Sequence, residues 1–186
     1  MKKVFALSQR KSRLWSFVIV LPWLLILCAS IASIGLYLTS TYLPEVGRSS
    51  RVMNFSPGTG QGNEMWGLLE HYVLLPFYEE VTYRFLPFCA LWYFYGRYLH
   101  RYPSFWTLCI VAVLLAIPFG LLHGNYANIL VQGATSLVVA GALVVVSENG
   151  DHPFRGLLAA TALHSLFNIV FVNRVLDLTR LPFLSS

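Results

Sequence analysis

The chain alternates long apolar segments with short polar ones, and the apolar segments have the length of membrane-spanning helices. A helix that crosses a bilayer needs about 20 predominantly apolar residues. Five segments approach or exceed that length: 15–38, 64–95, 105–122, 129–147 and 156–172. The segments between them are rich in glycine, proline or charged residues, which favour turns and loops. The pattern predicts an all-α protein, a polytopic transmembrane helix bundle of about five spans.

The composition agrees with a membrane protein. The chain has 186 residues, of which 56% are hydrophobic and 11% are charged, whereas soluble domains carry about 25% charged residues. Five spans use nearly the whole length, so residues 1–186 are expected to form a single integral-membrane domain. The formal charge of +5 is concentrated in clusters next to the spans, which is typical of membrane topology and not of nucleic-acid binding. The cysteines lack the spacing of disulfide or metal-binding motifs: Cys28, Cys89 and Cys109.

The basic clusters predict how the chain is oriented in the membrane. Lys2–Arg13 and Arg97–Arg101 are rich in lysine and arginine, and such clusters stay on the cytoplasmic side. The N-terminus is therefore expected in the cytoplasm, and the glycine-rich loop Ser40–Asn63 outside it. The apolar core of 15–38 exceeds the about 7–15 residues of a signal peptide, so we expect a retained first span, bent at Pro22.

The segment 64–95 carries three charged residues in the middle of its apolar run. A charged side chain at the bilayer centre costs about 2.5–3.5 kcal/mol on insertion scales, so such residues are usually paired or functional. Glu80 and Arg84 are four residues apart with the acid first, and they can pair on one helix face. Glu79 points about 100° away and has no basic residue one turn away on its own helix. We therefore expect Glu79 to find its partner on another helix.

Two histidines and an asparagine lie inside or at the edge of other spans. His123 follows the segment 105–122, and His164 and Asn168 share one face of the last span through their i, i+4 spacing. With Glu79 they form a candidate site with two possible chemistries. Glu79, His123 and His164 could hold Zn²⁺ with an open position, or Glu79 could activate a water while His164 and Asn168 stabilise an oxyanion. A buried polar network that only fixes helix packing is the structural alternative.

The order and spacing of these residues resemble a known family. Glu79 to Arg84 matches EExxxR, Phe119 to His123 matches FxxxH, and His164 to Asn168 matches HxxxN. This combination is similar to the CPBP family (Abi-type), which includes type II CAAX prenyl endopeptidases and bacteriocin-processing or self-immunity proteins. The resemblance covers 64–173. One departure is Phe85 after the motif arginine, where the family often has glycine.

The resemblance implies an intramembrane endopeptidase with a buried polar active site. Glu79 and His123 would activate water, His164 and Asn168 would stabilise the oxyanion, and Glu80 and Arg84 would shape the site. A metal-independent, glutamate-dependent mechanism is favoured over a zinc enzyme. The rival interpretation is a non-catalytic immunity or scaffold protein that binds a peptide in the same polar core.

Both interpretations share the same surroundings and partners. We expect the chain to lie in a lipid bilayer, the inner membrane of a prokaryotic cell. We do not expect it to bind nucleic acid. The expected substrate is a membrane-associated peptide or protein, such as a leader or C-terminal sorting segment. Because His123 ends an outward-running span, the site is expected to open toward the extracytoplasmic side.

Overall fold

The protein is all-helical in the part of the chain that the structure describes. The computed structural model describes residues 2–42, 64–123, 126 and 128–172, and the regular elements in these ranges are all helices. The loop predicted at Ser40–Asn63 lies outside the described residues from position 43 onward, and so does the tail 173–186.

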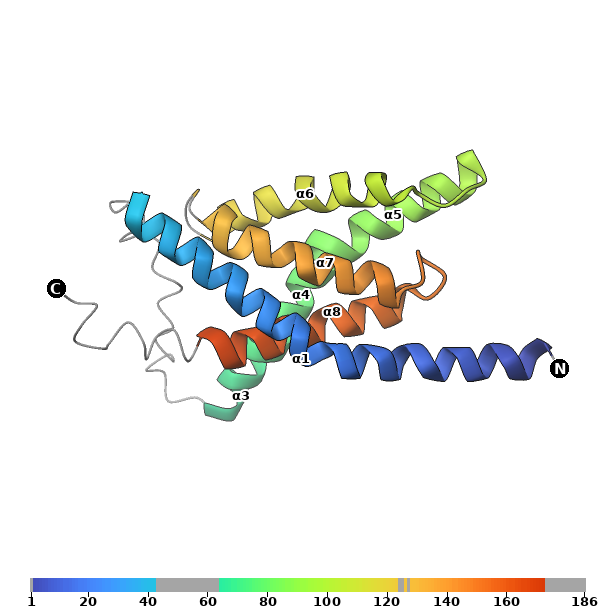
Figure 1. Ribbon diagram of the computed structural model, residues 1–186, viewed down its shortest axis with the longest axis horizontal. Helices are drawn as coiled ribbons and strands as arrows, with labels where there is room; N and C mark the ends of the chain where they lie inside the picture. Colours follow the sequence, from blue (N-terminus) through green and yellow to red (C-terminus); the bar gives the residue numbers. More distant parts are fainter. Residues whose placement is uncertain (1, 43–63, 124–125, 127, 173–186) are drawn as a thin grey trace.

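The described helices form continuous runs that lie side by side along the long axis of the bundle (Figure 1). The first run is α1 (Lys2–Tyr42). The second consists of α3 (Glu64–Leu69), η1 (Glu70–Leu74), α4 (Leu75–Glu80), η2 (Val81–Phe85), α5 (Leu86–Phe94) and η3 (Tyr95–Leu99). The others are α6 (Phe105–Leu122), η4 (Ile129–Gly133) with α7 (Ala134–Val146), and α8 (Pro153–Phe167) with η5 (Asn168–Val172).

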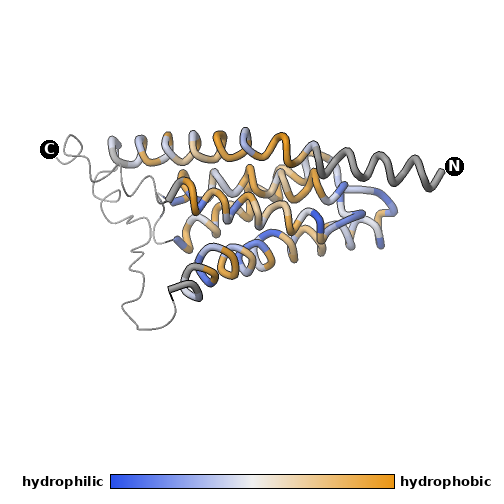
Figure 2. Tube along the Cα trace, turned by 90° about the horizontal axis from the view of Figure 1, so that it is seen from below, coloured by the Kyte–Doolittle hydropathy of each residue, from blue (hydrophilic) through white to orange (hydrophobic). Residues whose placement is uncertain are grey.

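Three helical stretches are long and apolar enough to cross a membrane: Ser16–Thr39, Phe105–Leu122 and Ile129–Val146. They indicate a membrane protein. The tube in Figure 2 is apolar along most of the bundle, but a hydrophilic stretch interrupts the run that begins at Glu64. The run from 64 to 99 and the run of α8 and η5 are not among these three stretches.

The first helix is longer than the span predicted at 15–38. It begins at Lys2 and continues to Tyr42, because no strong helix breaker other than Pro22 lies inside it and Pro44 follows shortly after its end. The helix changes direction along its length (Figure 1), and Pro22 is the proline inside it. A proline removes one backbone hydrogen bond and clashes with the preceding turn, which accounts for a bend.

Wide π-helical turns precede both prolines of the second run. The π-turn η1 (Glu70–Leu74) ends shortly before Pro76, and η2 (Val81–Phe85) ends shortly before Pro87. A proline ring collides with the carbonyl four residues earlier in a regular α-helix. A wider turn moves that carbonyl away, and such π-bulges occur frequently at functional sites. The pair Glu79–Glu80 lies between these two widened turns.

Small residues let the helices pack closely around α7. Contacts from α7 reach α1, α6 and α8. Three small residues of η4 and α7 are buried in these contacts: Gly133, Ser136 and Ala140. At Gly156, a Cβ atom would lie 2.4 Å from the carbonyl oxygen of Leu143. The helices α7 and α8 therefore approach to backbone contact.

Two turns lie together at one end of the bundle, at the right in Figure 1. One follows η3 and ends at Ser104, whose side chain caps α6 by accepting a hydrogen bond from the Thr107 amide at 3.1 Å. The other joins α7 to α8 and contains three consecutive residues with positive φ: Glu148, Asn149 and Gly150. The opposite end carries Tyr42, Glu64 and the turn between α6 and η4.

Candidate active site

Glu80 is the centre of a buried polar network. The predicted ion pair is present: Arg84 Nη1 donates to Glu80 Oε1. The same oxygen accepts a hydrogen bond from His164 Nδ1 at 2.7 Å. Glu80 is 0% exposed and Arg84 is 3% exposed. Removing either partner from such a pair would leave an uncompensated buried charge, so this network holds α4, η2 and α8 together.

Glu79 faces both histidines, which come from two other runs of the bundle. Its Oε2 lies 3.7 Å from His164 Nε2, and its Oε1 lies 4.0 Å from His123 Nε2. The expectation that Glu79 finds its partners on other helices therefore agrees with the structure. Both separations exceed a direct hydrogen bond. At this range one water molecule could hydrogen-bond to Glu79 and to a histidine at the same time.

In both His123 and His164, the Nδ1 atom donates a hydrogen bond to a fixed acceptor. His123 Nδ1 donates to the carbonyl oxygen of Phe119 at 2.8 Å, and His164 Nδ1 donates to Glu80. Because a carbonyl or carboxylate oxygen can only accept, the partner assigns the proton to Nδ1 in each neutral ring. Both Nε2 atoms, which face Glu79, are then available for chemistry. The arrangement places two acceptor nitrogens and one carboxylate around the same point.

Asn168 lies one turn beyond His164, where α8 passes into η5. It is partly buried, and its i, i+4 spacing places it on the same face as His164. The four predicted site residues therefore come from three runs of the bundle, and three of them meet within the distances above.

Two contributors to the site, Phe119 and Asn128, were not assigned a role from the sequence. The ring of Phe119 packs against His123 with centroids 4.7 Å apart, and the Arg84 guanidinium lies 4.3 Å over the same ring. Asn128 donates its side-chain amide to the backbone carbonyl of His123 at 2.6 Å and is buried. A polar residue in an otherwise apolar stretch was the available signal for Asn128, and only the fold shows what it contacts.

Helix α1 also reaches the site. Buried Cys28 lines a void of about 10 Å³, close to the volume that one water needs. The remaining lining includes Arg84 and His164 of the network, Gln132 of η4, and Thr135 and Ser136 of α7. The first span, which carries none of the three motifs, therefore forms part of the wall.

Glu79, His123 and His164 are residue types that bind zinc, but the Glu79 oxygens lie farther from the histidine nitrogens than the ligands of one zinc ion lie from each other. Two ligands of a tetrahedral zinc ion lie about 3.4 Å apart, whereas Glu79 lies 3.7 and 4.0 Å from the two histidines. Within the described ranges, no group of three His, Cys, Asp or Glu side chains is arranged to hold a metal ion. The choice between the two chemistries stays a prediction.

Comparison with protein-family models, with curated proteins and with solved structures finds no match to this chain.

Proposed function

We propose that the chain is an intramembrane endopeptidase of the CPBP type, with five membrane spans and Glu79 as its general base. The observation that supports the proposal most strongly is the convergence of Glu79 with the Nε2 atoms of His123 and His164. Three polar side chains from three runs meet inside an apolar bundle. Polar and ionisable side chains inside a membrane raise the free energy of insertion, so they are rare there and usually have a function.

The geometry supports a division of roles between the residues. A water between Glu79 and His123 would be held by the carboxylate and by the His123 Nε2 lone pair. Glu79 takes a proton from this water as its oxygen attacks the peptide carbonyl. In this step His164 is the doubly protonated ring, with a proton from solvent on Nε2 besides the Nδ1 proton held by Glu80, and the new oxyanion accepts hydrogen bonds from this Nε2–H and from Asn168. The tetrahedral intermediate then expels the amine, which receives the proton from Glu79.

Glu80 and Arg84 would act as positioning residues. Glu80 holds the Nδ1 proton of His164 and so directs Nε2 toward the reacting atoms, a common arrangement behind reactive or metal-bound histidines. Arg84 compensates the charge of Glu80 inside the bundle. The proposed substrate is a membrane-associated peptide or protein reached from the extracytoplasmic side, where α6 ends at His123.

The variant Glu79→Gln tests the proposal, because it keeps the side-chain shape and removes the base. Activity is measured by incubating the purified full chain with isolated membranes and sequencing the new peptide termini. We expect a loss of about 10²- to 10⁴-fold, with unchanged accumulation in membranes. Glu70→Gln is the matched control, since Glu70 lies on the same run and is exposed. Equal cleavage by both variants would rule out Glu79 as the base and favour the non-catalytic binding protein.

Chelation separates the two chemistries. If zinc were bound, Glu79, His123 and His164 would hold it, and the ion would polarise the carbonyl and activate water. We expect cleavage to survive exhaustive dialysis against a chelator. Loss of cleavage that stoichiometric zinc restores, together with zinc in the isolated protein, would replace the glutamate mechanism by the metal mechanism.

A further inference from the structure

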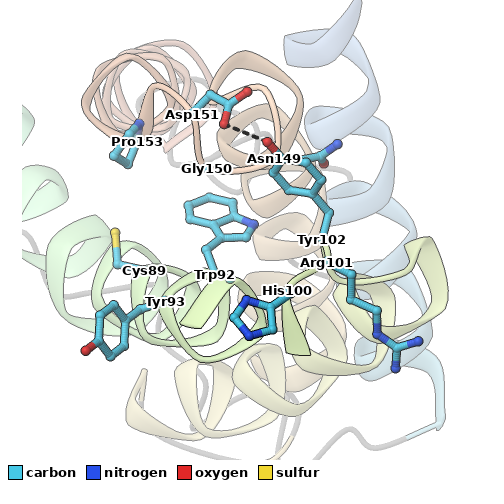
Figure 3. Close-up of a pocket in the computed structure, with 11 residues that line it drawn as sticks. Cys89, Trp92, Tyr93, His100, Arg101, Tyr102, Asn149, Gly150, Asp151 and Pro153 are labelled. Carbon is cyan, nitrogen blue, oxygen red and sulfur yellow. Dashed lines mark hydrogen bonds between the residues drawn. The ribbon is translucent and has the colours of Figure 1, made fainter. Parts of the chain in front are cut away.

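Two buried polar atoms in the helices of the candidate site have no hydrogen-bond partner. Among the described residues, three buried side-chain polar atoms are unpaired: Glu80 Oε2, Thr161 Oγ1 and Trp92 Nε1. Trp92 lies at one end of the bundle, next to Gly150 of the α7–α8 turn (Figure 3). Glu80 and Thr161 belong instead to α4 and α8, which pack against each other. Buried polar groups are nearly always paired, so this donor and this acceptor need an explanation.

The carboxylate of Glu80 uses only one of its two oxygens. Arg84 Nη1 and His164 Nδ1 both donate to Oε1, and Oε2 receives no hydrogen bond from the described residues although Glu80 is fully buried. An ionised carboxylate only accepts hydrogen bonds, so the partner of Oε2 must be a donor. A buried acceptor without a donor is unfavourable, because the water that it lost is not replaced. Oε2 is therefore the position for one more donor.

The hydroxyl of Thr161 is a donor that its own helix does not use. Threonine hydroxyls inside a helix commonly donate to the carbonyl three or four residues earlier. Thr39 donates to the Leu36 carbonyl and Thr135 to the Val131 carbonyl, both at 3.0 Å. Thr161 is buried within α8 and makes no such bond. Its hydroxyl is therefore available to a neighbouring helix.

The rotation of α8 directs Thr161 toward the run of Glu80. Residues of an α-helix are about 100° apart, so Thr161 lies about 60° to one side of His164. Gly156 and Phe167 lie about 80° and 60° to the other side. Gly156 touches α7, and Phe167 packs with α1. The remaining neighbour of α8 is α4 with its flanking π-turns, which is the run that carries Glu80.

We propose that the Thr161 hydroxyl donates to Glu80 Oε2, which makes Thr161 a positioning residue of the site. The inference rests on the proposed peptidase function, because Thr161 acts through Glu80 and His164 and not on the substrate. With both oxygens held, the carboxylate has one orientation. It then keeps the Nδ1 proton of His164 in place and directs Nε2 toward the oxyanion. Without the Thr161 donor the carboxylate can rotate, and the ring loses its direction.

Two substitutions at Thr161 separate its hydroxyl from its bulk. Thr161→Val keeps the shape and removes the donor, whereas Thr161→Ser keeps the donor and removes a methyl group. Cleavage is measured with the purified full chain in detergent and a peptide that spans the cleavage site. We expect Thr161→Val to lower kcat about tenfold with little change in KM, and Thr161→Ser to stay close to the unsubstituted protein.

The reverse order would overturn the proposal. A side chain that only fills space tolerates valine, which has the same shape, and is harmed by serine, which leaves a small cavity. Thr39→Val is the matched control, since Thr39 is also buried but its hydroxyl is bonded within its own helix. It should leave kcat unchanged. An equal loss in Thr39→Val and Thr161→Val would show a general effect of removing a buried hydroxyl and would also overturn the proposal.

Thermal unfolding in detergent tests the same contact without any assumption about activity. A neutral amide at position 80 accepts a weaker hydrogen bond than a carboxylate. We therefore expect Thr161→Val to lower the midpoint less in a Glu80→Gln background than in the unsubstituted protein, whereas additive effects would overturn the hydrogen bond. Coupled midpoints in a chain whose cleavage is unaffected by Glu79→Gln would support the hydrogen bond and refute the peptidase function. Cleavage that requires Glu79 but is unchanged in Thr161→Val would refute the positioning role alone.

Discussion

The two histidines of the candidate site differ in the group that fixes their Nδ1 atoms. His123 donates to a backbone carbonyl, which is neutral, and His164 donates to the carboxylate of Glu80. A carboxylate stabilises a positively charged imidazole ring far better than a carbonyl does. This difference in partner is the physical reason for assigning water activation to His123 and oxyanion stabilisation to His164 in the proposed mechanism.

Arg84 is predicted to stabilise the fold as well as the site. Replacing it by alanine leaves the fully buried Glu80 without its cation, at a cost of about 3–5 kcal/mol. We expect Arg84→Ala to lower the yield of monodisperse protein and the thermal midpoint in detergent. Arg97→Ala is the control, because Arg97 is exposed on η3 of the same run. If the two variants are equally stable and only Arg84→Ala is inactive, Arg84 acts on the substrate instead.

Residue spacing predicted only part of the polar network. The Glu80–Arg84 pair followed from their i, i+4 spacing, since helix geometry alone brings such residues together. The hydrogen bond from His164 to Glu80 joins residues 84 positions apart, and it depends on how α8 is rotated against α4. From the sequence pattern, His164 is expected to face Glu79 only. Such contacts depend on tertiary packing, which the local sequence pattern does not determine.

At the scale of elements, the apolar pattern predicted the helical runs well. Length and apolarity decide whether a segment can be a span, and both are visible in the sequence. The pattern did not reveal the π-turns η1 and η2, because the apolarity of a segment does not show whether its helix widens ahead of a proline. The predicted first span, 15–38, agrees with the apolar stretch Ser16–Thr39, although the helix itself extends beyond it at both ends, from Lys2 to Tyr42.

The packing of α7 against α8 is predicted to depend on Gly156. A Cβ atom there would lie 2.4 Å from the Leu143 carbonyl oxygen and 2.8 Å from Ser147 Cβ. Alanine must therefore push the helices apart, at a cost of about 1–3 kcal/mol. Gly141→Ala is the matched control, since a Cβ at Gly141 meets nothing within 4 Å. Thermal unfolding in detergent should show a lower midpoint for Gly156→Ala alone; similar midpoints for both variants would contradict the backbone contact.

At the scale of the whole molecule, the proposed five-span topology predicts which positions face the outside of the cell. Single cysteines at Tyr126 and Arg155, both exposed, test it after Cys28, Cys89 and Cys109 are replaced. An impermeant thiol reagent applied to intact cells should label position 126 and leave position 155 unmodified. The reverse result would invert the topology and move the site to the cytoplasmic side. Gly150 is unsuitable for this test, because a side chain there would collide with Trp92.

The widened turns of the second run also change how its sequence must be read. A π-turn takes up about one residue more than an α-turn, so each one shifts the phase of a helical wheel by about 100°. A single wheel drawn through residues 64–99 therefore assigns Glu79 and Trp92 to the wrong relative faces. It also follows that deleting one residue within Val81–Phe85 would restore regular winding. The aromatic half of the run would then keep its orientation toward the bundle, because the π-turn already absorbs the extra residue, whereas deleting a residue from a regular α-helical part of the run would rotate that half by about 100°.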